Sequence, residues 1–150
     1  KKKLKSAFYY KNKKFAIIYV HDFDIEIYQR IAVTIIPTDP KYILYSIRGE
    51  IDFPEDIDNC KIKKDKIVKD IDEIFKKLKK REAKQAHGFD KTGKSLVYTT
   101  EFAFANKDEI RVFCLDWTPK ITQEEKWEDT LNVNLSSWKL INFLNTEAFE

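Results

Sequence analysis

A chain of 150 residues with 43% hydrophobic and 14% aromatic residues has enough apolar side chains to bury a core, which excludes an intrinsically disordered protein even though 35% of the residues are charged. No apolar run approaches the roughly 20 residues that a helix needs to span a bilayer, so we expect the chain not to be embedded in a membrane. The formal net charge is +3, and four arginines stand against twenty-four lysines, a bias that codon usage explains as well as binding does.

In the N-terminal third of the chain, apolar and polar residues alternate as they do in β-strands. Aromatic and β-branched residues at 8–10 and 15–20 flank a turn of lysine and asparagine at 11–14, which predicts a hairpin. Between residues 23 and 35, the apolar side chains on one face are Phe23, Ile25, Ile27, Ile31, Val33 and Ile35. We expect one or two half-buried strands that end at Pro37, and a further strand over residues 42–48 before a bend at Gly49.

The periodicity of residues 65–87 predicts a long amphipathic helix. Its apolar stripe consists of Ile67, Ile71, Ile74, Phe75 and Leu78, spaced as one face of a 3.6-residue helix. Asp65 is a suitable N-cap, and Gly88 suits the left-handed position just past the last turn. We expect the stripe to face the sheet and to be nearly fully buried.

The last third predicts a hairpin, a central strand and two short helical segments. Residues 96–104 alternate, and residues 110–117 are largely apolar on both faces, which favours a strand in the middle of a sheet. Thr122 and Glu125 form a capping box for a short helical turn, and after a strand at 131–135 either Ser136 or Ser137 caps a closing helix. The prediction is a single α+β domain, residues 1–150, with an antiparallel β-sheet packed against one long amphipathic helix and a short C-terminal helix.

The two cysteines are placed where a disulfide could form. Cys60 precedes the predicted long helix and Cys114 lies in the predicted central strand, so a bridge would join the helix entrance to the sheet. Disulfides persist in oxidising compartments, and the pair therefore favours a periplasmic or secreted protein. The alternative is a pair of buried thiols in a cytoplasmic protein, because free cysteine behaves as a small hydrophobic residue.

Two further surfaces are candidate binding sites. The basic patch consists of Lys76, Lys77, Lys80, Arg81 and Lys84, at the predicted C-terminal end of the long helix. It could contact nucleic acid or anionic lipid, but a solvated helix end that complements the helix dipole is the preferred interpretation. The aromatic surface consists of Tyr9, Tyr10, Tyr28, Tyr42 and Tyr45, which we expect to be partly exposed on the N-terminal strands.

A carboxylate row and the histidine near the end of the predicted helix are candidate metal and catalytic sites. Asp22, Asp24 and Glu26 could hold calcium, yet the Asp-, Asn- and Gly-rich loop of such sites is missing, so the solvent-facing side of a strand is preferred. The other candidate set is His87, Asp90 and Ser95. No nucleophile elbow or oxyanion loop accompanies it. We therefore expect no catalytic residues, no metal site and no cofactor.

Two classes of function remain. The preferred one is a small exported domain, cross-linked by a disulfide, that binds a protein or a small ligand without catalysis. The alternative is an intracellular basic domain that contacts nucleic acid without sequence preference, which is disfavoured because arginine, the residue that reads bases bidentately, is scarce. A hydrolase of unfamiliar design is a third hypothesis, without a set of residues to support it.

Overall fold

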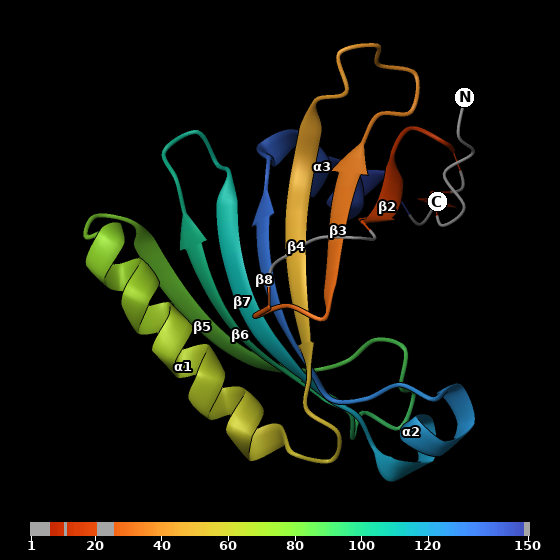
Figure 1. Cartoon of the computed structure of the whole chain (residues 1–150), viewed down its shortest axis with the longest axis vertical. Helices are drawn as coiled ribbons and strands as arrows, with labels where there is room; N and C mark the ends of the chain where they lie inside the picture. The colour runs from red at the N-terminus through yellow and green to blue at the C-terminus, as the bar shows by residue number, and fades with distance from the viewer. Residues whose placement is uncertain (1–6, 11, 21–25, 149–150) are drawn as a thin grey trace.

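The structure, a computed structural model, describes residues 7–10, 12–20 and 26–148. Within this part the chain forms eight strands and three helices (Figure 1). The strands are β1 (Ala7–Tyr9), β2 (Ala16–Val20), β3 (Arg30–Ile35), β4 (Leu44–Asp52), β5 (Lys79–Ala86), β6 (Leu96–Ala103), β7 (Glu109–Asp116) and β8 (Thr130–Ser136). The helices are α1 (Ile57–Ile74), α2 (Pro119–Glu125) and α3 (Trp138–Thr146). The predicted α+β class is confirmed, and the sheet is its dominant part.

The strands form one antiparallel sheet in the order β1-β2-β3-β4-β8-β7-β6-β5. The chain builds it as two meanders, β1–β4 and β5–β8, which join where β4 pairs with β8. Helix α1 carries the chain from β4 to the far edge strand β5, so that β1 and β5 form the two edges of the sheet. The predicted N-terminal hairpin is present as β1 and β2, and β7 lies inside the sheet as expected.

The two larger helices lie on opposite faces of the sheet (Figure 1). Helix α1 packs on β6, β7 and β8 over a core of Cys60, Val68, Phe102, Ile110, Val112, Cys114 and Leu131. Cys60 and Cys114 form a disulfide with their Cα atoms 6.1 Å apart, so the predicted pair is joined in the structure. On the other face, α3 begins at its N-cap Ser137 and buries a second core of Phe15, Leu140, Phe143 and Ala148.

The predicted helix over residues 65–87 is wrong at both ends. Helix α1 begins after Asp56, whose side chain accepts the N–H of Asn59 at 3.2 Å, and ends at Ile74. Neither Asp65 nor Gly88 caps it. Residues 79–86 form β5 instead, paired with β6 from Lys79↔Ala103 to Ala86↔Leu96. Lysine, arginine, glutamate and alanine favour helices, so here pairing with β6 overrides local propensity.

The expected burial of the helix stripe is only partly correct. Ile67, Ile71 and Leu78 pack at the edge of the core, whereas Ile74 is 71% exposed and Phe75 is 38% exposed. The buried residues of α1 are Cys60, Lys64 and Val68, which are spaced four residues apart on a neighbouring stripe. The face that α1 buries is therefore centred on these residues and not on the predicted stripe.

Three smaller predictions also differ from the structure. Helix α2 is capped by Thr118 with Pro119 in its first turn, one turn earlier than the capping box at Thr122 suggested. Ile27 lies in an exposed turn rather than a strand, while Phe23 and Ile25 lie outside the described residues. Gly49 does not bend the chain. It lies within β4, where a Cβ atom would come 2.5 Å from the ring of Tyr28.

Candidate functional site

Beside the second core under α3, the face of the sheet opposite α1 carries a band of polar side chains, and all four arginines of the chain lie on it. One row of side chains crosses this face from β5 to β4 as Arg81, Glu101, Arg111, Asn134 and Arg48. Arg30 joins the same face, because its register partner Glu50 lies two residues from Arg48 on β4. A chain that otherwise uses lysine as its base thus has arginine on this face, which we call the polar face.

The charges at the β3–β4 part of the polar face are paired with one another. Arg30 donates to both carboxylate oxygens of Asp52 at 2.6 and 2.5 Å, and its Nε donates to Glu50 at 2.7 Å. Hydrogen bonds from Arg30 hold the pKa of Asp52 below its ordinary value. On the other side of Glu50, the Nε of Arg48 lies 2.8 Å from a carboxylate oxygen. The planar guanidinium explains the arginine here, because a lysine ammonium cannot engage two carboxylates through a rigid fork.

A pocket of about 530 Å³ opens on the polar face, at the end of the sheet near α2. Its floor is polar and consists of Arg30, Arg48, Glu50, Asp52, Thr130 and Asn132. Its wall consists of His87, Leu115, Trp117 and Trp127, and Lys126 and Glu128 complete the lining. We call it the sheet-face pocket.

Aromatic rings stack along the wall of the sheet-face pocket. Ring centroids are 4.5 Å apart between His87 and Trp117, 4.9 Å between Trp117 and Trp127, and 4.6 Å between Trp127 and Phe89. Trp127, between Trp117 and Phe89 in this stack, remains 36% exposed. An indole offers a large rigid apolar face together with one N–H donor, which suits a binding wall.

A buried carboxylate ties together the two loops that carry this wall. Asp90 accepts from the hydroxyl of Thr92 at 2.7 Å, and from the hydroxyl and the backbone N–H of Ser95 at 2.7 and 2.9 Å. The Ser95 hydroxyl in turn accepts the N–H of Thr118, next to Trp117, at 3.1 Å. Hydrogen bonds from Thr92 and Ser95 hold the pKa of Asp90 well below its usual range. Asp90 therefore stays ionised and, through Ser95, ties its loop to the backbone next to Trp117.

A second carboxylate holds Trp117 from the other side. Asp129 accepts the backbone N–H of Trp117 at 2.8 Å, and its own carbonyl accepts the N–H of Phe53 at 2.7 Å. Burial raises the pKa of Asp129, opposed by the hydrogen bond from Trp117. The wall is thus anchored to the chain segment that follows β4.

His87 and Ser95 are close in the fold but are not arranged as base and nucleophile. The backbone N–H of His87 donates to the carbonyl of Ser95 at 2.8 Å, whereas its Nδ1 accepts the N–H of Phe89 at 3.2 Å. Ser95 is fully buried and its hydroxyl donates to Asp90. Burial lowers the pKa of His87, opposed by the charge of Asp90, so the ring is neutral at neutral pH.

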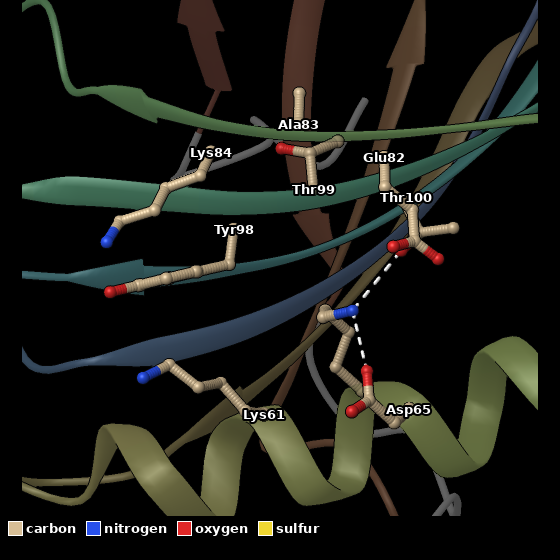
Figure 2. Close-up of a pocket in the computed structure, with 9 residues that line it drawn as sticks. Lys61, Asp65, Glu82, Ala83, Lys84, Tyr98, Thr99 and Thr100 are labelled. Carbon is tan, nitrogen blue, oxygen red and sulfur yellow. Dashed lines mark hydrogen bonds and ion pairs between the residues drawn. The ribbon is translucent and has the colours of Figure 1, made fainter.

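A second pocket, of about 380 Å³, lies between α1 and strands β5 and β6 (Figure 2). The ring of Tyr98 lies between two ammonium groups, 4.4 Å from Lys61 and 5.3 Å from Lys84. Deeper in the pocket, the buried Lys64 donates to Asp65 at 2.7 Å and to Thr100 at 3.2 Å. We call this pocket the lysine groove.

The predicted basic patch does not lie on one face of a helix. Lys76 and Lys77 lie in the connection after α1, and the other three cations belong to β5. Strand alternation turns Lys80 and Lys84 to the α1 side and Arg81 to the polar face. Lys80 pairs with Asp72 at 2.6 Å and Arg81 with Glu101 at 2.5 Å, so two of the five charges are engaged.

The five tyrosines of the predicted aromatic surface are also separated. Tyr10 packs edge-on against Phe143, and Tyr45 against Phe15, around the second core. Tyr28 lies over Gly49 on the α1 side of the sheet. Of the five, Tyr9 and Tyr42 are exposed by more than half, at 51% and 71%.

Among the described residues, no group of three or more His, Cys, Asp or Glu side chains is arranged to hold a metal ion. Asp22 and Asp24, two members of the carboxylate row, lie outside the described residues, and Glu26 is an exposed turn residue. In the same described part, none of the helices combines the length and apolarity that crossing a membrane would require.

Comparison of the chain with models of protein families, with curated proteins and with solved structures gave no significant match. Sequence reasoning missed the sheet-face pocket, although one signal was present. Arg48, Glu50 and Asp52 alternate along one strand in a chain with only four arginines, and that pattern marks a charged face rather than a buried one.

Proposed function

We propose that the chain is a non-catalytic binding module of an exported protein, and that its sheet-face pocket binds a neutral polyhydroxylated ring, the chemistry of a saccharide. The observation that carries the proposal is the wall of Trp117 and Trp127 beside a floor of paired charges. Pockets of about 300–1,000 Å³ with aromatic lining and a few fixed polar groups are typical of small-ligand sites.

The charge of the lining favours a neutral ligand. Three cations, Arg30, Arg48 and Lys126, face three anions, Glu50, Asp52 and Glu128. Arg30 already engages both carboxylates of the floor, so an ionic ligand would have to displace an existing ion pair. Hydroxyl groups can instead donate to and accept from the free lone pairs and N–H groups of the same side chains.

The wall supplies the complementary apolar surface. The C–H faces of a pyranose ring are apolar, and an indole is a flat partner of similar width. Trp127 is accessible, and Trp117 is held by Asp129 and by the loop that Asp90 orders. A wall fixed in advance binds with a smaller loss of conformational entropy than a mobile one.

Export is supported by the disulfide between Cys60 and Cys114. Disulfides of this structural kind form and persist in oxidising compartments and are rare where glutathione and thioredoxin keep thiols reduced. A periplasmic or secreted location is the part of this proposal that rests on the bridge.

Tryptophan fluorescence and two-dimensional NMR titrations test the proposal. The probes are neutral mono- and disaccharides, with uronic acids and amino sugars as charged counterparts. We expect at least one neutral sugar to shift the indole N–H signals of Trp117 and Trp127. Trp127→Ala should abolish the response, while Trp138→Ala, which removes an exposed indole on α3 outside the pocket, should leave it unchanged.

Two results would overturn this function. One is the absence of any response across the sugar panel. The other is a response that Trp138→Ala removes and Trp127→Ala does not. A preference for the charged sugars would contradict the argument for a neutral ligand. It would mean that a charged ligand displaces the ion pairs between the arginines and carboxylates of the pocket floor.

A further inference from the structure

Strand β5 is a long, regular and exposed edge. Its eight residues, Lys79–Ala86, pair with β6 without a register shift, and no described strand pairs with its other side. Every one of the eight residues is exposed. Such an edge presents a row of backbone donors and acceptors that another strand can use.

The backbone groups that face outward can be assigned from the ladder. The N–H of His87 donates to the carbonyl of Ser95 across the pair at 2.8 Å. In an antiparallel ladder the backbone groups turn inward and outward at alternate residues. Lys80, Glu82 and Lys84 therefore direct their N–H and C=O groups away from β6 and toward the free edge.

The charge of this edge selects its partner. Strand β5 carries four cations, Lys79, Lys80, Arg81 and Lys84, against one acid, Glu82, and two of these cations, Lys80 and Arg81, also pair with Asp72 and Glu101 on neighbouring elements. Pairing with a second copy of the same strand would bring together two strands that each carry four cations and one acid, which is unfavourable. The lysine groove extends the positive surface, because Lys84 and Lys61 flank Tyr98 on the side of β5 that faces α1 (Figure 2).

We propose that the free edge of β5 binds an extended acidic peptide as a ninth strand of the sheet. The peptide backbone pairs with the outward groups of Lys80, Glu82 and Lys84. Its acidic side chains lie beside the lysine groove when they point to the α1 side, and beside Arg81 when they point to the opposite side. Backbone pairing supplies affinity and the alternating charges supply selectivity, as in other cases of strand addition.

The matched variants Glu82→Pro and Glu82→Ala separate backbone pairing from charge. Both remove the same negative charge, but only proline also removes an outward N–H, a position where an edge strand tolerates it. The probe is a fluorescein-labelled decapeptide of alternating glutamate and valine, measured by fluorescence anisotropy. We expect Glu82→Ala to bind as tightly as the parent or tighter, and Glu82→Pro to bind about tenfold more weakly or worse.

Two further measurements complete the test. Two decapeptides N-methylated at alternate residues, one at the odd and one at the even positions, keep the charge of the probe but each lack one set of backbone N–H groups. We expect at least one of them not to bind. This measurement gives an answer even if Glu82→Pro does not fold. Amide hydrogen exchange at Lys80, Glu82 and Lys84 should slow when the unmodified peptide is bound. Three outcomes would each overturn the proposal: equal binding by both Glu82 variants, binding by both N-methylated peptides as tight as that of the unmodified peptide, or no binding by the unmodified peptide. None of these outcomes bears on the sheet-face pocket.

Discussion

The imidazole of His87 packs edge-on against the indole of Trp117, with 4.5 Å between the ring centroids. The same ring accepts the N–H of Phe89 through Nδ1. One neutral histidine thus contacts Trp117 of the wall and Phe89 beside it, and the hydrogen bond from Phe89 requires Nδ1 to carry no proton.

Folding stability should therefore depend on the charge of His87. Burial lowers the pKa of His87 in the folded chain below its unfolded value of about 6.5. Between those two values the unfolded chain binds more protons, so this contribution is fully present above about pH 6.5 and is lost as the pH falls toward the folded pKa. Thermal melts at a series of pH values should show this loss, and His87→Gln should remove it. An NMR titration that placed the pKa of His87 above 6.5 would contradict the prediction.

The disulfide should be closed in the isolated protein and should contribute to stability. Thiol titration of the denatured, unreduced chain is expected to find no free cysteine, because Cys60 and Cys114 are bonded to one another. Opening a bridge between residues 54 apart should cost about 2–4 kcal/mol of the free energy of unfolding. Urea melts with and without reductant measure this cost. The variant with both cysteines replaced by alanine is the control and should not respond to reductant.

Gly49 should resist substitution where Gly88 does not. A Cβ atom on Gly49 would lie 2.5 Å from the ring of Tyr28, whereas a Cβ atom on Gly88 would meet nothing within 4 Å. We expect Gly49→Ala to cost about 1–3 kcal/mol, as overpacking does, and Gly88→Ala to cost less than about 0.5 kcal/mol. Urea melts compare the two. Combining Gly49→Ala with Tyr28→Ala should cost less than the sum of the single changes, because the clash is then absent.

Truncations on α1 should follow the observed burial rather than the apolar stripe predicted from the sequence. Val68 is 7% exposed within the core and Ile74 is 71% exposed. We therefore expect Val68→Ala to cost about 1–3 kcal/mol and Ile74→Ala less than about 0.5 kcal/mol, although the second change removes more atoms. Equal costs in urea melts would show that α1 is rotated relative to the structure.

The position of a site on a fold of this kind depends on pairings between distant strands. The polar face brings together Arg30, Arg48 and Asn132 from three strands, and the wall adds Trp117 and Trp127 from loops. Each residue lies in a segment of ordinary composition. They converge because α1 carries the chain to the far edge strand β5, and the second meander then returns until β8 pairs with β4. Helix α2, between β7 and β8, lies at one end of the sheet.

The amino-acid sequence by itself determined what local patterns encode: the α+β class, the N-terminal hairpin, an interior strand at β7, a serine cap for α3 at residue 136 or 137, and a cysteine pair able to join helix to sheet. Only the tertiary structure decided the end of α1, the strand character of residues 79–86 and the sheet-face pocket. The reason is the same in each case. An edge strand that is exposed on both faces needs no alternation of apolar and polar residues. The sequence of β5 therefore resembles that of a charged helix, and its strand conformation depends on the hydrogen bonds to β6. A pocket assembled across strands has no spacing in the sequence to reveal it.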